Sequence, residues 1–405
     1  MKHVLSLILA LSIFPATSWG HGDVEVAASQ IFTTDGSELS LSEVRGQVLN
    51  DQLDVRISYE RLLQAQKKIA EARAQYFPYG VGTVAALYFL NAWTPLILIE
   101  LVTSLPSKIY QVQSEKNMRM AAKYDHVALR ENVKNQIATL YYTILKEEAG
   151  LKLMGQEIVL MEELLGVIDE QIGLGLSQYE DRQRVELRLL DLRDIALRFD
   201  SFLAEEKAAF NELIGEGPEA DLKLEPVRPF LTPTSLRTPM DVVARTAVEK
   251  SPEIVSAQYR IQAARRSRSS VKWSILSFSG IGFGHWSRVQ VAGSRITEAK
   301  LNKELVTANI KAGAQLAHSK YRRQVGAFAN NATALDATTL YLRGERAMYD
   351  AGSSSLDRLI EVELLYLRDF SDWAIAHYDA LIRLDDLARA YQADLQLNSS
   401  TTAVH

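Results

Sequence analysis

Two long stretches of the sequence contain no proline, and this feature limits the folds open to the chain most strongly. No proline occurs in residues 107–217 or after Pro252, whereas five of the ten prolines lie in residues 218–239. Proline interrupts a helix because it lacks an N–H donor and its ring clashes with the preceding turn. The two stretches can therefore hold helices much longer than the about 11–12 residues usual in globular domains, and residues 218–240 are expected to form an extended linker.

Apolar residues recur at spacings of three and four through both stretches, which is the pattern of a coiled-coil seam. The seam covers residues 137–172, continues over 185–213 with a break near Glu206, and returns over 356–391. A single helix over residues 107–172 would be on the order of 100 Å long, at about 1.5 Å per residue. We therefore predict a mainly α-helical fold of long antiparallel coiled-coil hairpins.

The two halves of the chain repeat one another. The sequence GLGLSQYEDRQRVEL at 173–187 is echoed by AGSSSLDRLIEVEL at 351–364, and matching Gly175 with Gly352 gives an offset of 352 − 175 = 177. The segments that open the halves also match, because residues 49–78 resemble residues 248–273. Each echo is expected to be the tip of a helical hairpin, in which the glycine ends one helix and a serine, Ser177 or Ser354, caps the next.

The N-terminus has the layout of a secretory signal peptide, with a basic start, an apolar run and small residues, so we expect export. The organisation expected for the chain is a signal peptide, an N-terminal periplasmic segment, a first repeat with its tip near 173–180, the linker, a second repeat with its tip near 350–357, and a tail. Their bounds are 1–20, 21–43, 44–217, 218–240, 241–396 and 397–405.

Composition excludes several classes of function. A formal net charge of −5 argues against a nucleic-acid-binding protein, and the one locally basic run, at 260–273, is interpreted as a solvated helix end. The chain has no cysteine, so neither a lipid-anchor signal nor a disulfide framework is expected. Its seven histidines are scattered without ligand spacing, and no catalytic motif occurs. We expect no enzyme activity, no cofactor and no metal site.

The duplicated arrangement resembles the TolC-type outer-membrane efflux proteins. The resemblance covers residues from about 44 to 396 and is most detailed at IATLYYTILKEE (137–148), at both tips, and at LIGEGPEADLKL (213–224). It implies a homotrimer whose hairpins form a helical barrel across the periplasm, with short strands at the membrane end. It also implies a conduit in a tripartite efflux or type I secretion-like system, which takes substrates from an inner-membrane pump and a periplasmic adaptor through the outer membrane.

The resemblance places the functional residues at the tips. Acidic side chains near the second tip constrict the periplasmic mouth in this family, and the candidate gate residues are Asp357, its counterpart Glu180, and Glu361. The family has a second aspartate where this chain has Ile360. Since acids also favour the first turn of a helix, charge alone does not distinguish a gate from ordinary capping. The segments on which adaptors dock correspond to Gly175, Leu176, Ser177, Gly352, Ser353 and Ser354.

The membrane end departs from the family pattern. The second insert, 274–293, could supply one alternating strand and a weak return strand at Val289 and Val291. The first insert, 79–106, is almost entirely apolar without alternation, so it could form two reduced strands or a helical hairpin on a membrane. The candidate membrane-end residues are Trp93, Glu100, Phe278, Phe283 and Trp286.

Two other classes of function remain open from the sequence. An exported α-helical pore-forming protein would explain an apolar hairpin between long amphipathic helices, but it needs no second tip. A periplasmic coiled-coil scaffold would explain the helices but not the apolar inserts.

Overall fold

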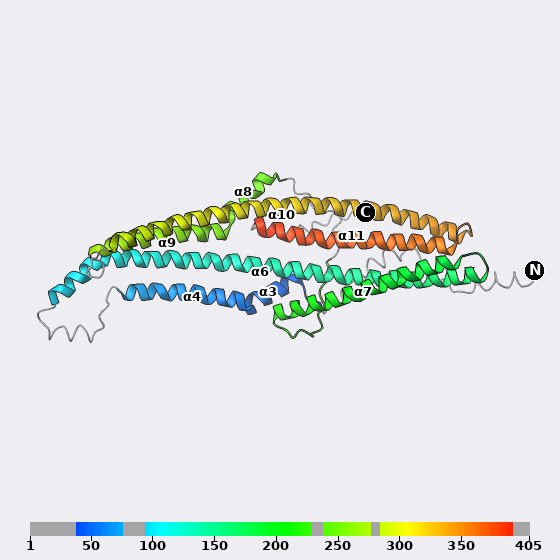
Figure 1. Ribbon diagram of the computed structural model, residues 1–405, viewed down its shortest axis with the longest axis horizontal. Coiled ribbons are helices and arrows are strands. Elements are labelled where there is room, and N and C mark those ends of the chain that lie inside the picture. Colours follow the sequence, from blue (N-terminus) through cyan, green and yellow to red (C-terminus); the bar gives the residue numbers. More distant parts are fainter. Residues whose placement is uncertain (1–37, 76–93, 228–237, 277–283, 392–405) are drawn as a thin grey trace, which may run out of the picture.

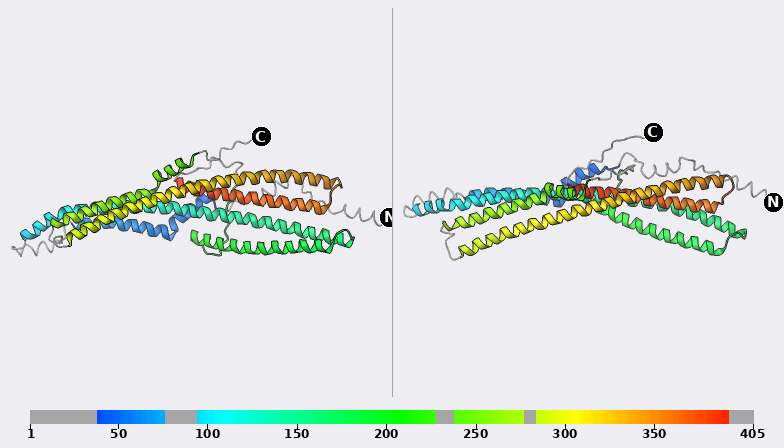
Figure 2. Two further views of the ribbon diagram at one scale, coloured as in Figure 1. Left: turned by 45° about the horizontal axis from the view of Figure 1, so that its top comes forward. Right: turned by 90° about the horizontal axis from the view of Figure 1, so that it is seen from above.

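The computed structural model describes residues 38–75, 94–227, 238–276 and 284–391, and the described chain is an elongated array of helices (Figure 1). Figure 2 shows the same narrow shape from two further directions. The elements are α3 (Leu41–Asp51), α4 (Leu53–Ala74), α6 (Thr94–Gly173), α7 (Tyr179–Ile214), α8 (Met240–Lys250), α9 (Pro252–Trp273), the short 3₁₀ helix η1 (Ser274–Leu276), α10 (His285–Asp350) and α11 (Leu356–Tyr391).

The helices of the two halves correspond closely in length. The helices α3 and α8 each have 11 residues, α4 and α9 each have 22, and α7 and α11 each have 36. The exception is the long helix, which has 80 residues in the first half as α6 and 66 in the second as α10. The duplication that the sequence predicts therefore extends to single helices, and the halves differ mainly at the end opposite the tips.

The array is ordered across its width. The helices α6 and α10 run its whole length, and α9 and α11 lie end to end between them, packed against both (Figure 1). On the far side of α6, α4 and α7 also lie end to end. One edge of the array is therefore α4 and α7, and the other edge is α10.

The apolar seam forms the core, as the spacing predicts. Ile137, Tyr141 and Ile144 of α6 are fully buried in the largest apolar cluster, near the middle of the molecule. A second cluster closer to the tips joins α6 and α7 with Ile360 of α11. A helix with one apolar face becomes stable only when another helix covers that face, so this packing rather than helix propensity maintains such long helices.

The segment that ends the first half returns to the core through a tight turn. Gly215 ends α7 at φ 82°, a left-handed conformation that glycine adopts without strain. The following chain pairs with the start of the described residues, because Leu39 and Leu224 form a parallel bridge. The buried Tyr141 hydroxyl lies 2.6 Å from the Glu225 carbonyl oxygen and 3.1 Å from that of Leu39. The LIGEGPEADLKL sequence is thus a helix end followed by a strap across the middle of the array.

Part of the membrane-end prediction is wrong. Val289 and Val291 lie in α10 rather than in a return strand, and His285, Val289 and Ala292 are buried near the start of this helix. Spacings of four and three place these three residues on one face of a helix. The helical spacing therefore decided the structure, although Val289 and Val291 also fit the alternation of a strand. In the first insert, the chain is helical from Thr94 onward, which favours the helical alternative for that part. Trp93, Phe278, Phe283 and the side chain of Glu100 lie outside the described residues.

None of the described helices is both long and apolar enough to cross a membrane.

Candidate functional site: the helical tips

The two tips lie together at one end of the molecule and have the same backbone hydrogen bonds (Figure 1). In the first tip, the N–H of Gly175 donates to Ile172 and that of Leu176 donates to Gln171, at 2.9 and 2.8 Å. In the second tip, Gly352 donates to Tyr349 and Ser353 to Met348, both at 2.9 Å, and each of these pairs is displaced by 177 positions. This is the Schellman ending of a helix, and Gly175 and Gly352 have φ values of 73° and 72°.

The residues predicted to dock an adaptor differ in chemistry between the tips. Leu176 is 75% exposed at the first tip, next to the exposed Leu174. At the second tip, Ser353 Oγ donates to the Met348 carbonyl oxygen at 2.8 Å, and Ser354 Oγ donates to the buried carboxylate of Glu345. The first tip therefore presents apolar surface, and the second presents serines engaged with their own helix end.

The serines are not the N-caps that the sequence suggested. The N-cap residue of α7 is Gln178, one position after Ser177, and the Gln178 N–H donates to Asp181 Oδ2 at 3.4 Å. In the second tip, α11 starts at Leu356, and the first backbone bond of the helix runs from Leu359 to Ser355.

The three candidate gate acids occupy different environments. Asp357 lies in the first turn of α11 and accepts a hydrogen bond at 3.4 Å from Gln171 Nε2, so it faces the end of α6. Glu180 is exposed in the first turn of α7. Glu361 is paired with Arg358 at 3.1 Å. Ile360, at the family's second aspartate position, is 2% exposed in the apolar cluster near the tips and is a packing residue here.

Ion pairs between helices close both hairpins, and these were not predicted from the sequence. In the first tip, Arg182 of α7 contacts Asp169 of α6 at 2.7 Å, and it also contacts Glu186 of its own helix at 2.6 Å. In the second, Arg346 contacts Glu363 at 2.7 Å. Asp169 and Glu186 are the 177-offset counterparts of Arg346 and Glu363, but both are acidic, and Arg182 contacts the two of them in the first hairpin.

Burial near the second tip also affects Glu163 of α6. Burial raises the pKa of this carboxyl group above its usual range, and the nearby charge of Glu363 raises it further. Arg346 pairs with Glu363 and offsets part of this negative charge.

The two edges of the array keep apolar side chains exposed to solvent. On α7, Leu187 is 65% and Leu197 71% exposed, although Leu189 and Leu192 on the other face are buried against α6. On α10, Leu340 is 68% exposed, and Leu301, Leu305 and Leu316 are exposed farther along the same helix. Leucines at these spacings on a second face are typical of a helix that packs against two neighbours.

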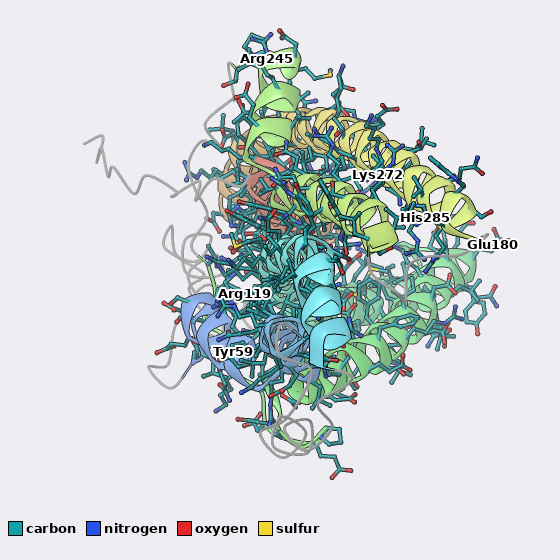
Figure 3. All side chains as sticks on the ribbon, turned by 90° about the vertical axis from the view of Figure 1, so that its left-hand side faces the viewer. Tyr59, Arg119, Glu180, Arg245, Lys272 and His285 are labelled. Atoms are coloured by element: carbon teal, nitrogen blue, oxygen red, sulfur yellow. The ribbon has the colours of Figure 1, made fainter. Side chains whose placement is uncertain are left out.

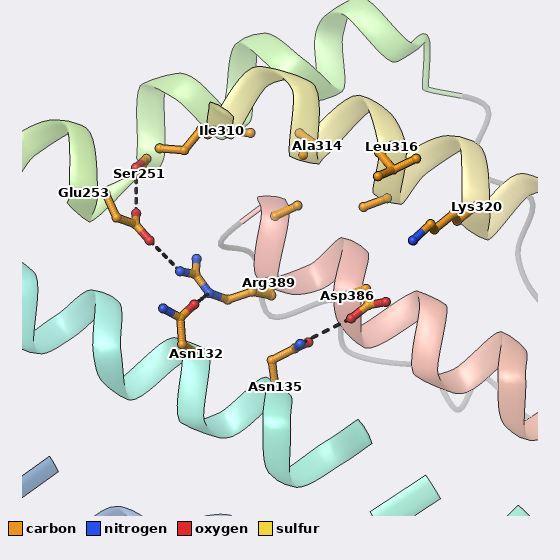
Figure 4. A pocket seen from close by; sticks show the side chains of 14 residues that line it. Asn132, Asn135, Ser251, Glu253, Ile310, Ala314, Leu316, Lys320, Asp386 and Arg389 are labelled. Atoms are coloured by element: carbon orange, nitrogen blue, oxygen red, sulfur yellow. Dashed lines mark hydrogen bonds and ion pairs between the residues drawn. The ribbon is translucent and has the colours of Figure 1, made fainter. Parts of the chain in front are cut away.

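A pocket of about 340 Å³ lies in the middle of the array, where α11 ends and α9 begins (Figure 4). In it, Arg389 of α11 contacts Glu253 of α9 at 2.5 Å and Asn132 of α6 at 2.7 Å. Burial alone would raise the pKa of Glu253, but the hydrogen bonds from Ser251 and Arg389 outweigh burial and lower it. These contacts join three helices, so we interpret this pocket as a structural junction.

His377 of α11 is packed inside the protein. It is 3% exposed and lies among the rings of Phe328, Trp373 and Tyr378. Burial lowers the pKa of its imidazole to about 4, although a hydrogen bond with the backbone of Val227 partly opposes this effect.

Comparison with solved structures identifies the fold. The outer-membrane channel OprN matches with a TM-score of 0.67 and 13% identity, over 87% of this chain and 89% of that chain. The Campylobacter jejuni CmeC outer membrane channel matches with a TM-score of 0.65 and 11% identity, over 90% and 91% of the two chains. This chain has the fold of these outer-membrane channels. The Vibrio cholerae outer membrane protein VceC also matches, with a TM-score of 0.65 and 13% identity, over 87% of this chain and 96% of that chain.

The fold predicted from the TolC-type resemblance is therefore confirmed. No family model matches the sequence, and no curated protein matches it. At 11–13% identity, the likeness to the solved structures concerns the backbone arrangement.

Proposed function

We propose that the chain forms a homotrimeric conduit of a tripartite efflux or type I secretion-like system. In this proposal one end lies in the outer membrane, and the tips meet a periplasmic adaptor that connects the conduit to an inner-membrane pump. The duplicated helical array with two tips at one end and exposed apolar edges supports it, together with the fold shared with outer-membrane channels. A pore-forming protein or a scaffold would need neither the second tip nor the matched edges.

The observation that carries the proposal is a contact that the internal duplication implies but one chain cannot make. Within the chain, the long helix of the first half, α6, packs against α11, the return helix of the second half. The equivalent contact joins α10, the second long helix, to α7, the first return helix. In the described chain α7 and α10 lie at opposite edges of the array. A neighbouring copy can supply this contact, and repeating it closes a ring.

The duplication also predicts the register of this contact. The Gln171–Asp357 hydrogen bond joins α6 to α11, and adding 177 to the first position and subtracting 177 from the second gives Met348 and Glu180. Both residues are exposed in the single chain. Met348 of one copy is therefore expected to face Glu180 of the next.

Cysteine cross-linking tests this contact directly, because the natural chain contains no cysteine. The double variant Met348→Cys/Glu180→Cys should form disulfide-linked dimers and trimers upon oxidation in the cell envelope, whereas either single variant should not. The control is Met348→Cys with Arg198→Cys, because the Arg198 side chain is 71% exposed but lies about 27 Å farther along α7 than Glu180, at about 1.5 Å per residue. A ladder that stops at dimers, or equal cross-linking in the control, would contradict the ring.

The proposal assigns a gate and a docking surface to the tips. Copies of Asp357 and Glu180 would bring like charges together around a narrow opening, which attracts cations and resists passage of anions. The exposed Leu176 at the first tip supports docking of a partner with apolar side chains. The exposed Trp286 at the opposite end of the array supports contact of that end with the membrane.

A further inference from the structure

The end of the array opposite the tips has an unusual charge pattern. Residues 254–297 contain no aspartate or glutamate, although the whole chain has a net charge of −5. The end of α9 and the start of α10 carry six basic residues in this interval, which are Arg265, Arg266, Arg268, Lys272, Arg288 and Arg295. The first tip has the opposite sign, because residues 169–181 contain four acidic residues and no basic one. The first tip and the α9–α10 end therefore differ in charge.

Several of these basic side chains are exposed. Arg265, Arg266 and Lys272 are exposed, whereas Arg268 is half-buried and its Nε atom is buried without a hydrogen-bond partner in the described structure. The Arg266 guanidinium lies over the ring of Tyr110 at 5.9 Å from the ring centre, which orients it without neutralising its charge. Figure 3 looks onto this end and shows Lys272 and His285 at the ends of their helices.

Large apolar and aromatic side chains are exposed at the same level. Trp273 ends α9 and is 44% exposed, and Trp286 in the first turn of α10 is 73% exposed. Ile275 and Leu276, which lie between them, are also exposed. Tryptophan is enriched where a protein crosses from water into the headgroups of a bilayer, because its ring is amphipathic. A nucleic-acid-binding surface would not require the exposed aliphatic side chains of Ile275 and Leu276.

We propose that the α9–α10 end, which comprises residues 265–276 and 285–295, binds the phosphate groups of anionic lipids at a bilayer surface. Trp273 and Trp286 lie at the headgroup level, and the basic side chains face the phosphates. The inference rests on the proposed function only in that this end faces the membrane. Charge complementarity selects the lipid, since a basic residue near an anionic bilayer surface contributes about 1 kcal/mol, which is a factor of about five in binding.

A competition assay on the purified full-length protein in detergent tests this site. The probe is an acyl-labelled dioctanoyl phosphatidylglycerol, and its binding is measured by fluorescence anisotropy. Unlabelled dioctanoyl phosphatidylglycerol should displace the probe at a concentration at least tenfold lower than dioctanoyl phosphatidylcholine. Raising the salt concentration should weaken binding, because screening shortens the range of surface charges.

Substitutions then locate the site. The triple variant Arg265→Gln/Arg268→Gln/Lys272→Gln should weaken phosphatidylglycerol binding at least tenfold. The matched control, Arg184→Gln/Arg188→Gln/Arg198→Gln, removes the same charge from exposed positions on α7 and should change binding less than twofold. If the triple variant loses helix content by circular dichroism, the exposed Lys272→Gln alone should still weaken binding roughly fivefold.

Several results would overturn the proposal. Equal displacement by phosphatidylcholine would show that headgroup charge is not recognised. Displacement by inorganic phosphate at the same concentration would indicate a site for free anions, and stronger displacement by a single-stranded oligonucleotide would indicate a nucleic-acid surface. Unchanged binding in the triple variant would place the lipid elsewhere. None of these results affects the Met348–Glu180 cross-link, so failure here is distinguishable from failure of the proposed function.

Discussion

Two carboxyl groups face each other between the helices of the first hairpin. Glu147 of α6 and Glu206 of α7 are half-buried, and the Oε2 atom of each is buried without a hydrogen-bond partner in the described structure. Burial, and then the proximity of Glu206, raise the pKa of Glu147 to about 7. The apolar seam is interrupted near Glu206 in the sequence, and this pair occupies the interruption.

The pair should destabilise the folded protein at alkaline pH. Because the pKa of Glu147 is higher in the folded chain than its ordinary 4.5, the folded state binds the proton more tightly. The penalty is absent below about pH 4.5, grows as the pH rises, and is complete above about pH 7. The difference between the two pKa values limits the loss of folding stability to about 3.4 kcal/mol. Because water screens a half-buried group, we expect a loss of about 1–2 kcal/mol.

Substitution of Glu147 by glutamine tests this reasoning. Glu147→Gln removes the charge and keeps the shape, so the free energy of unfolding should rise by about 1–2 kcal/mol at pH 8 and stay unchanged at pH 4.5. The measurement is urea-induced unfolding followed by circular dichroism at both pH values. Protein concentration must be held constant, because assembly contributes to apparent stability.

The adjacent residue provides a control of opposite sign. Glu148 forms an ion pair with Lys207 at 2.6 Å, so Glu148→Gln should lower stability at pH 8 by about 0.5 kcal/mol, as expected for a partly exposed pair. The reasoning is refuted if Glu147→Gln gives no gain at pH 8, or the same gain at both pH values.

Three further predictions concern the packed histidine and the tips. Because the neutral imidazole of His377 is the buried form, the natural protein should lose up to about 3 kcal/mol of stability as the pH falls from 6.5 toward 4, and His377→Phe should remove this loss. Unfolding of both proteins at pH 4.5 and 7.5 checks this, and equal losses in both would contradict it. Gly352→Ala should cost about 1–2 kcal/mol in unfolding free energy because φ is positive there, whereas Gly344→Ala inside α10 should gain up to about 1 kcal/mol; equal effects would remove the turn argument. Asp357→Ala should widen the resting pore and reduce its cation preference in single-channel recordings, and unchanged conductance and selectivity would rule out its role as a gate.

Much of the helical arrangement could be predicted because it depends on local patterns that occur twice. Missing prolines and the three-four spacing of apolar residues indicate long helices, although α6 starts at Thr94 and continues through Pro106, where the sequence placed its boundary. Gly175 and Gly352 mark the turns because few other residues adopt a positive φ. The 177-residue offset between the tips reappears in their backbone hydrogen bonds.

The tertiary structure decided what local patterns leave open. Val289 alternates with Val291 like a strand, but burial against a neighbouring helix made the helical period prevail. Arg346 and Glu363 lie 17 residues apart and meet only because the hairpin brings their helices together, and the same holds for Glu147 and Glu206. A sequence pattern specifies which face of a helix is apolar, but which faces meet, and which stay uncovered at α7 and α10, depends on the packing of the whole chain.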